Sequence, residues 1–213
     1  MPPATSLIPK PLYEIFFIFN LDIMFKKFFA SKKEKSPEEL GQLLYQVIQM
    51  GLSHEKLSVE ALLKSLNLTE NDVVGDYQTE VMVALMFQVI LVVEKQYDYP
   101  IAGDILDGMT KEFLSHTKEM GGTEEDLKYM LALFQNRMKE YYEAERNTQG
   151  DGPAYWVGKK FFENLTGKSQ SHVNDYDRDA DMPIKFNFLI AANHLTATLT
   201  GIDSVLKEYT VKK

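Results

Sequence analysis

The sequence predicts an all-α protein, an irregular bundle of six to seven helices around one fully apolar helix at about residues 79–95. Three observations support this fold class. Beyond residue 36, apolar residues recur at the three- and four-residue spacing of a buried helix face. Capping residues and prolines precede these stretches, and glycines follow several of them. The sequence pattern also lacks the alternation and hairpin turns that are typical of strands.

The first predicted helix starts at Ser36. Serine can cap a helix, Pro37 suits the first helical position, and Glu39 stands where the glutamate of a capping box belongs. A second, short helix follows Ser58, and residues 67–76 are expected to form a turn region.

The central helix is predicted from an uninterrupted apolar run. Every residue from Val81 to Val93 is apolar except Gln88. A helix that is apolar on all sides is buried on all sides. The thirteen residues of this run are long for a strand and too few to span a bilayer, which needs about 20.

Each remaining helix has its own start signal. Helices are predicted from Pro100, from Thr123 to about Asn147, and from Pro153 to Gly167. The longest internal loop, residues 168–181, separates them from a final helix.

The final helix is predicted to begin near residue 181 and to carry apolar residues at helical spacing as far as residue 209. Such a seam is long enough to be shared between subunits. Four of its residues are therefore the predicted interface with a protein partner or a second copy of the chain: Phe188, Leu195, Leu199 and Ile202.

Length and composition limit the function classes. The 213 residues suffice for one sizeable core, so residues 36–213 are expected to form a single domain. A net charge of -8 argues against nucleic-acid binding. The chain has no cysteine, which excludes disulfides, thiolate metal sites and cysteine nucleophiles and favours a cytoplasmic location.

Residues 1–35 form a basic, phenylalanine-rich segment. Six lysines and three acids give it a net charge of +3, which leaves -11 for residues 36–213. Three interpretations stay open: an extended start upstream of an initiator Met24, a helix that docks on the domain through its phenylalanines, and a membrane-surface anchor. In the third, which involves residues 12–35, Phe25, Phe28 and Phe29 enter the lipid while the lysines meet anionic headgroups.

Residues 168–181 carry carboxylates at alternate positions, as calcium-binding loops do. The sequence therefore predicts a divalent cation as a candidate cofactor here. Its ligands would be Asp175, Asp177 and Asp179, with His172 as a fourth.

The same loop departs from an EF-hand. Ala180 and Phe186 stand where that motif needs a glycine and a bidentate glutamate. The alternative is a solvated loop whose last acid, Asp181, caps the final helix.

Two further groups of residues are interpreted as structural. Glu112 and His116 are four residues apart, but the Glu-x-x-His pairs of di-iron bundles are missing, so these two are expected on an exposed polar face. The aromatic residues between Tyr155 and Phe162 are expected in the core, with Lys159 on the solvent side.

No phosphate-binding loop, dinucleotide fingerprint or nucleophile elbow is present in the sequence. The leading hypothesis is consequently a non-catalytic helical domain that acts through protein contacts. The alternatives are a ligand- or metal-binding domain, or an enzyme, with its site near residues 172–181, and a peripheral membrane protein anchored by residues 12–35.

Overall fold

The computed structural model describes residues 34–55, 57–149, 152–175, 177, 181–197 and 199–211. Nearly all of the basic N-terminal segment lies outside these residues, as does Asp179 of the acidic loop.

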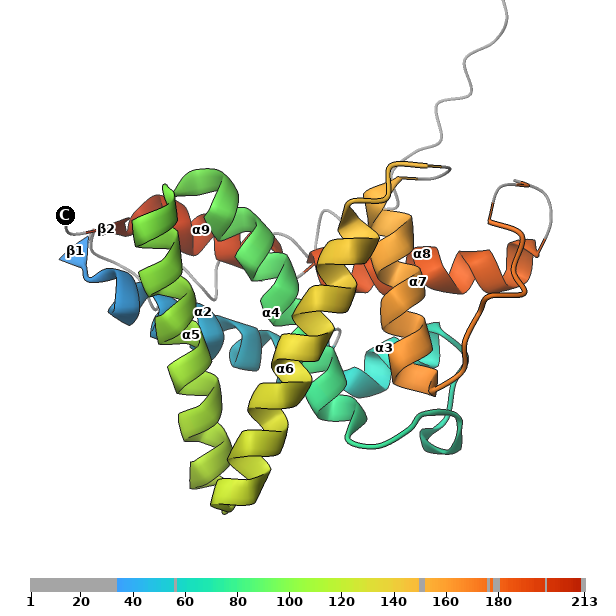
Figure 1. Ribbon diagram of the computed structural model, residues 1–213, viewed down its shortest axis with the longest axis horizontal. Coiled ribbons are helices and arrows are strands. Elements are labelled where there is room, and N and C mark those ends of the chain that lie inside the picture. The colour runs from blue at the N-terminus through green and yellow to red at the C-terminus, as the bar shows by residue number, and fades with distance from the viewer. Residues whose placement is uncertain are drawn as a thin grey trace, which may run out of the picture.

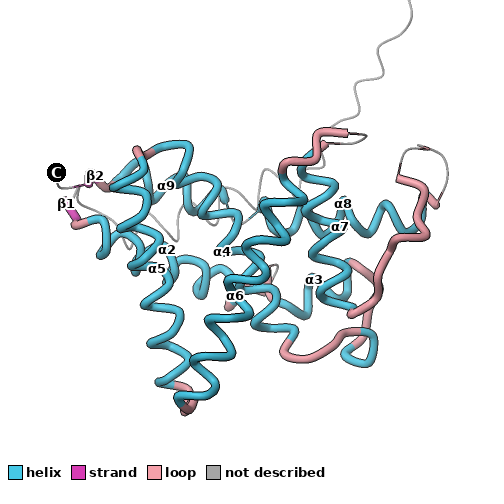
Figure 2. The backbone as a smooth tube through the Cα atoms, viewed as in Figure 1, coloured by secondary structure: helices cyan, strands magenta, loops and turns pink. Residues whose placement is uncertain are grey.

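The described chain is all-α apart from one short parallel pair of strands (Figures 1 and 2). The strands β1 (Glu34–Lys35) and β2 (Thr210–Val211) bring the two ends of the described chain together. The helices are α2 (Pro37–Leu52), α3 (Val59–Ser65), the 3-10 turn η1 (Glu70–Asp72), α4 (Tyr77–Gln96), α5 (Tyr99–Glu119), α6 (Glu124–Glu145), α7 (Pro153–Thr166), α8 (Met182–Ala197) and α9 (Leu199–Glu208). The predicted all-α helical bundle is confirmed.

The helix starts follow the capping chemistry of the sequence. The backbone N–H of Glu39 donates to the Ser36 hydroxyl at 3.2 Å, and the Ser36 N–H donates to the Glu39 carboxylate at 2.9 Å. Thr123 and Asp126 form the same reciprocal pair at the start of α6. These bonds satisfy backbone donors that the first turn of a helix leaves without partners.

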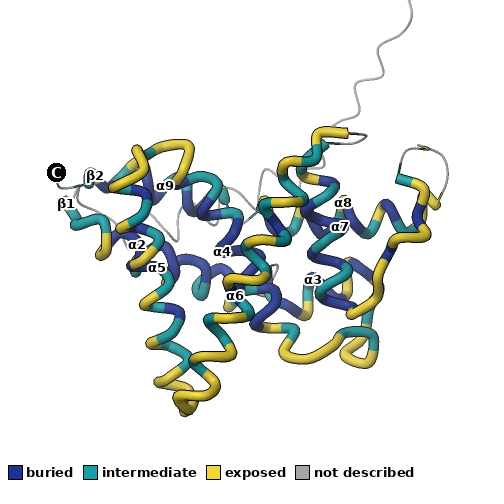
Figure 3. Tube along the Cα trace, in the orientation of Figure 1, coloured by how far each residue is buried: buried dark blue, intermediate teal, exposed yellow. Residues whose placement is uncertain are grey.

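The apolar helix α4 is the centre of the bundle. It packs against α2, α5, α6, α7, α8 and α9, and Figure 3 shows most of its length as buried. By length and composition α4 could also cross a membrane, but 61% of its most apolar window is buried inside the chain. Packing within the protein therefore accounts for most of its apolar surface.

Glycines allow two pairs of helices to approach closely. A Cβ at Gly41 of α2 would lie 1.9 Å from the Ile105 carbonyl oxygen of α5, and one at Gly108 of α5 would lie 2.3 Å from the Glu38 carbonyl oxygen of α2. In the same way, a Cβ at Gly158 of α7 would lie 2.1 Å from the Phe188 carbonyl oxygen of α8. A side chain at any of these positions would force the backbones apart.

The final helix lies where it was predicted. Residues 181–209 were expected to form one helix, and the structure describes helical residues in α8 and α9, on either side of residue 198, which lies outside the described residues. The apolar spacing continues through both helices.

Candidate functional site

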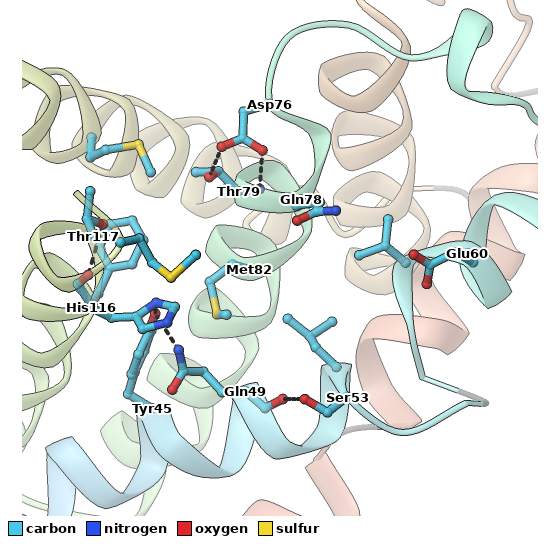
Figure 4. A pocket seen from close by; sticks show the side chains of 15 residues that line it. Tyr45, Gln49, Ser53, Glu60, Asp76, Gln78, Thr79, Met82, His116 and Thr117 are labelled. Carbon is cyan, nitrogen blue, oxygen red and sulfur yellow. Dashed lines mark hydrogen bonds between the residues drawn. The ribbon is translucent and has the colours of Figure 1, made fainter. Parts of the chain in front are cut away.

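A cleft of about 680 Å³ opens where five helices meet. The C-terminal half of α2 and the last turns of α5 form part of its wall, and α3, the start of α4 and α6 supply the rest (Figure 4). Ligand sites in proteins commonly have volumes of about 300–1,000 Å³. The cleft is therefore large enough to receive a small ligand or several side chains of a partner.

Three side chains form a hydrogen-bonded group in the cleft (Figure 4). The Tyr45 hydroxyl lies 3.2 Å from Nδ1 of His116, and Nε2 of Gln49 donates to the same hydroxyl at 3.3 Å. Burial, followed by the nearby charge of Glu112, raises the pKa of Tyr45 to about 12. The phenol stays protonated at neutral pH, so Tyr45 is suited to hydrogen bonding and not to acting as a base or nucleophile.

Methionine and aromatic side chains supply the apolar part of the wall. Met82 comes from α4, Met120 from the end of α5 and Met130 from α6, while Phe113 lies at the buried base. Met120 is 77% exposed, which is unusual for a large apolar side chain. Methionine is flexible and polarizable, so a wall of this kind can adapt its shape to an apolar ligand.

The formal charges that line the cleft are negative. Glu60 lies in the first turn of α3, and Asp76 caps α4 by accepting the Thr79 backbone N–H at 3.1 Å. Within the part of the chain that the structure describes, no lysine or arginine lines the cleft. Such a site favours neutral or cationic ligands over phosphates and carboxylates.

Of the three predicted metal ligands, Asp175 has a carboxylate that is engaged with other side chains of the protein. Asp175 accepts hydrogen bonds from the Tyr155 hydroxyl at 2.6 Å and from the ammonium group of Lys159, with which it forms an ion pair. Asp177 is exposed, and its backbone carbonyl accepts a hydrogen bond from the buried Lys185. Asp179 lies outside the described residues.

The rest of the acidic loop shows the same internal pairing. The carboxylate of Asp181 accepts the backbone N–H of Asn174 at 3.0 Å, and His172 is exposed. Among the described residues, no group of three or more histidines and acids is placed to hold a metal ion. A cation at this loop stays a prediction, and it would have to displace Lys159 from Asp175.

Lys159 corrects another expectation. It was expected on the solvent side of α7, but it is buried, and its Nζ lies 5.4 Å from the centroid of the Trp156 ring. Its partner Asp175 is 16 residues further along the chain. The long aliphatic part of the Lys159 side chain is buried, while its ammonium group reaches the Asp175 carboxylate at the edge of the core. The predicted burial of the neighbouring Tyr155 and Phe162 is observed.

The predicted interface residues lie mostly inside the chain. Phe188, Leu195 and Ile202 are fully buried, and Leu199 is half-buried. The exposed apolar face of α8 consists of other residues: Met182, Phe186 and Leu189. A partner or second copy on the C-terminal helices stays a prediction, and these three side chains are the ones free to meet it.

A buried polar network joins α4 to α6 without opening into the cleft. Glu80, only 5% exposed, accepts hydrogen bonds from the Tyr141 hydroxyl at 2.6 Å and from Nε of Arg137 at 2.7 Å. Arg137 also donates to Glu140 at 3.0 Å. A buried carboxylate needs such partners, so this group is best explained as structural.

Comparison of the chain with protein-family models, curated proteins and solved structures finds no significant match. The function is therefore argued from the cleft itself.

Most residues of the cleft were not predicted as site residues from the sequence. His116 was noticed but assigned to an exposed polar face, whereas the structure places it beside Tyr45, 71 residues earlier in the chain. One signal was available in the sequence. Met120 directly precedes two glycines at a helix end. A methionine at such a position does not have to belong to the core.

Proposed function

We propose that the protein is a non-catalytic helical interaction protein whose cleft binds an apolar, basic segment of a protein partner. The observation that carries the proposal is a cleft of about 680 Å³ with a flexible methionine wall, in which Glu60 and Asp76 are the carboxylates among the described lining residues. Grooves that receive one face of an amphipathic helix have this character.

The polar group in the cleft suits recognition. Tyr45, Gln49 and His116 form a continuous hydrogen-bonded group, so a ligand that enters meets oriented donors and acceptors beside an apolar surface. A few polar groups within an apolar pocket fix the orientation of a ligand. Tyr45 itself is buried and its hydroxyl bonds with Gln49 and His116, so these two half-buried side chains are the ones that a ligand meets.

The test uses two short fluorescein-labelled amphipathic helical peptides with identical leucines, one carrying lysines and the other glutamates. Fluorescence anisotropy with the full chain should show saturable binding of the lysine peptide and much weaker binding of the glutamate peptide. Preference for the glutamate peptide would contradict the proposal.

Matched double variants separate the cleft from the overall negative charge. Glu60→Lys with Met120→Ser changes two exposed cleft residues, and Glu143→Lys with Met182→Ser makes the same changes elsewhere. The cleft variant should lose at least about tenfold in affinity for the lysine peptide, a change of about 1.4 kcal/mol, while the matched variant keeps it. Equal losses would mean that the peptide binds through general charge attraction and that the cleft is not its site.

A further inference from the structure

The cleft and the N-terminal segment of the same chain have complementary chemistry. Residues 16–29 contain six phenylalanines together with Lys26 and Lys27, and Asp22 is their one acid. The cleft offers methionine and aromatic walls, and among its described lining residues Glu60 and Asp76 carry carboxylates. Opposite charges beside matching apolar surfaces favour association.

The start of the described chain lies within reach of the cleft. Glu34 precedes α2 directly, and the C-terminal half of α2 lines the cleft. Tyr45 is the first residue of α2 that lines the cleft, and it follows Pro37 by eight residues, about 12 Å at 1.5 Å per residue. An extended chain covers roughly 3.3–3.6 Å per residue, so about four residues, such as 30–33, span that distance and leave residues 16–29 to meet the cleft.

We infer that residues 16–29 occupy the cleft of their own chain and block it to other ligands. This inference rests on the proposed function, since it names an intramolecular competitor for the same site. The phenylalanines match the methionine wall in polarity, and Lys26 and Lys27 match the acidic rim in charge. A partner segment must displace residues 16–29, so the N-terminal segment lowers the affinity of the cleft for that partner.

Tethering makes even weak docking effective. A short flexible connection gives an attached segment an effective concentration in the millimolar range. A segment that binds with a dissociation constant of about 100 μM would then lower the apparent affinity of an external peptide about tenfold.

The test exploits the absence of natural cysteine. Asn20→Cys gives the full chain a single thiol for a nitroxide spin label. Methyl-labelled methionines report on their distance from that label. The methyl signals of Met82, Met120 and Met130 should broaden. That of Met182 should not, because α8 begins at the far right of the molecule in Figure 1.

A triple variant provides the control. This variant combines Phe25→Ser, Phe28→Ser and Phe29→Ser in the labelled full chain. It should lose the broadening and bind the lysine peptide about tenfold more tightly. Thermal unfolding would verify that the variant retains its fold. Unchanged broadening in the variant would overturn the inference.

Three other outcomes would each overturn it. Broadening between a spin-labelled chain and a separate isotope-labelled chain would assign the contact to a second copy. Flotation with phosphatidylserine vesicles, lost in the triple variant and without broadening in the cleft, would assign the segment to a lipid surface. Unbroadened cleft methionines with intact binding of the lysine peptide would refute the intramolecular contact alone and leave the proposed function standing.

Discussion

Acidification from pH 7.5 to 4.5 should destabilise the protein through His194. This side chain lies on α8, and its Nε2 atom is buried without a hydrogen-bond partner. Burial lowers its pKa from 6.5 to about 4, partly offset by a backbone hydrogen bond with Leu57. In the unfolded chain the imidazole takes up a proton near pH 6.5, while in the folded chain it stays neutral until about pH 4.

The stability that a neutral His194 contributes is therefore present above pH 6.5 and lost as the pH falls toward 4. A difference of about 2.5 pKa units corresponds to roughly 3 kcal/mol at about 1.4 kcal/mol per unit. Most of that loss should occur before pH 4.5 is reached. For a chain of this size it corresponds to a decrease in melting temperature of about 6–12 °C.

Urea unfolding at half-unit steps between pH 7.5 and 4.5 would measure this dependence. His194→Gln keeps a polar side chain but cannot titrate, so its free energy of unfolding should fall much less over the same range. His172→Gln, at an exposed position, should behave as the unchanged protein does. Parallel pH profiles for the unchanged protein and His194→Gln would refute the assignment.

Two further substitutions test the packing. Gly108→Ala places a Cβ 2.3 Å from a backbone oxygen of α2 and should destabilise by about 1–3 kcal/mol in urea unfolding. Gly103→Ala on the same helix meets no atom within 4 Å and should stabilise by up to about 1 kcal/mol, so equal effects would contradict the close contact. Arg137→Leu leaves the buried Glu80 without its cation and should cost roughly 3 kcal/mol. Lys111→Leu breaks an exposed pair and should change stability little by the same measurement.

The sequence predicted the helices well because the signals that define them are local. Ser36, Thr123 and Pro153 each stand at a helix start, where capping or a fixed φ angle acts within a few residues. The burial of α4 was also predictable, since an apolar run with no polar side leaves no other arrangement. These inferences need no knowledge of which helices become neighbours.

The cleft and the buried ion pairs depend on that knowledge. From the sequence alone, Lys159 is expected at the surface. Its burial follows from the ion pair with Asp175, which only the folded chain brings next to α7. From the sequence alone, Glu80 is expected to be an exposed acid in the first turn of α4. It can be buried because Arg137 and Tyr141 of α6, 57 and 61 residues later in the chain, donate hydrogen bonds to its carboxylate. Pairings across such separations leave no periodic signal in one sequence.

The cleft follows from how α2 and α5 pack along their length. Near the start of α2, Gly41 brings the two backbones into contact. Further along α2, an aromatic ring makes the contact with α5. Tyr45 lies 6.1 Å, centroid to centroid, from Phe113 and also from His116. Tyr45, Phe113 and His116 line the cleft, and α3, α4 and α6 supply its remaining walls. Glycines thus mark the closely packed part of the helix pair, and these larger side chains mark the part that borders the cleft.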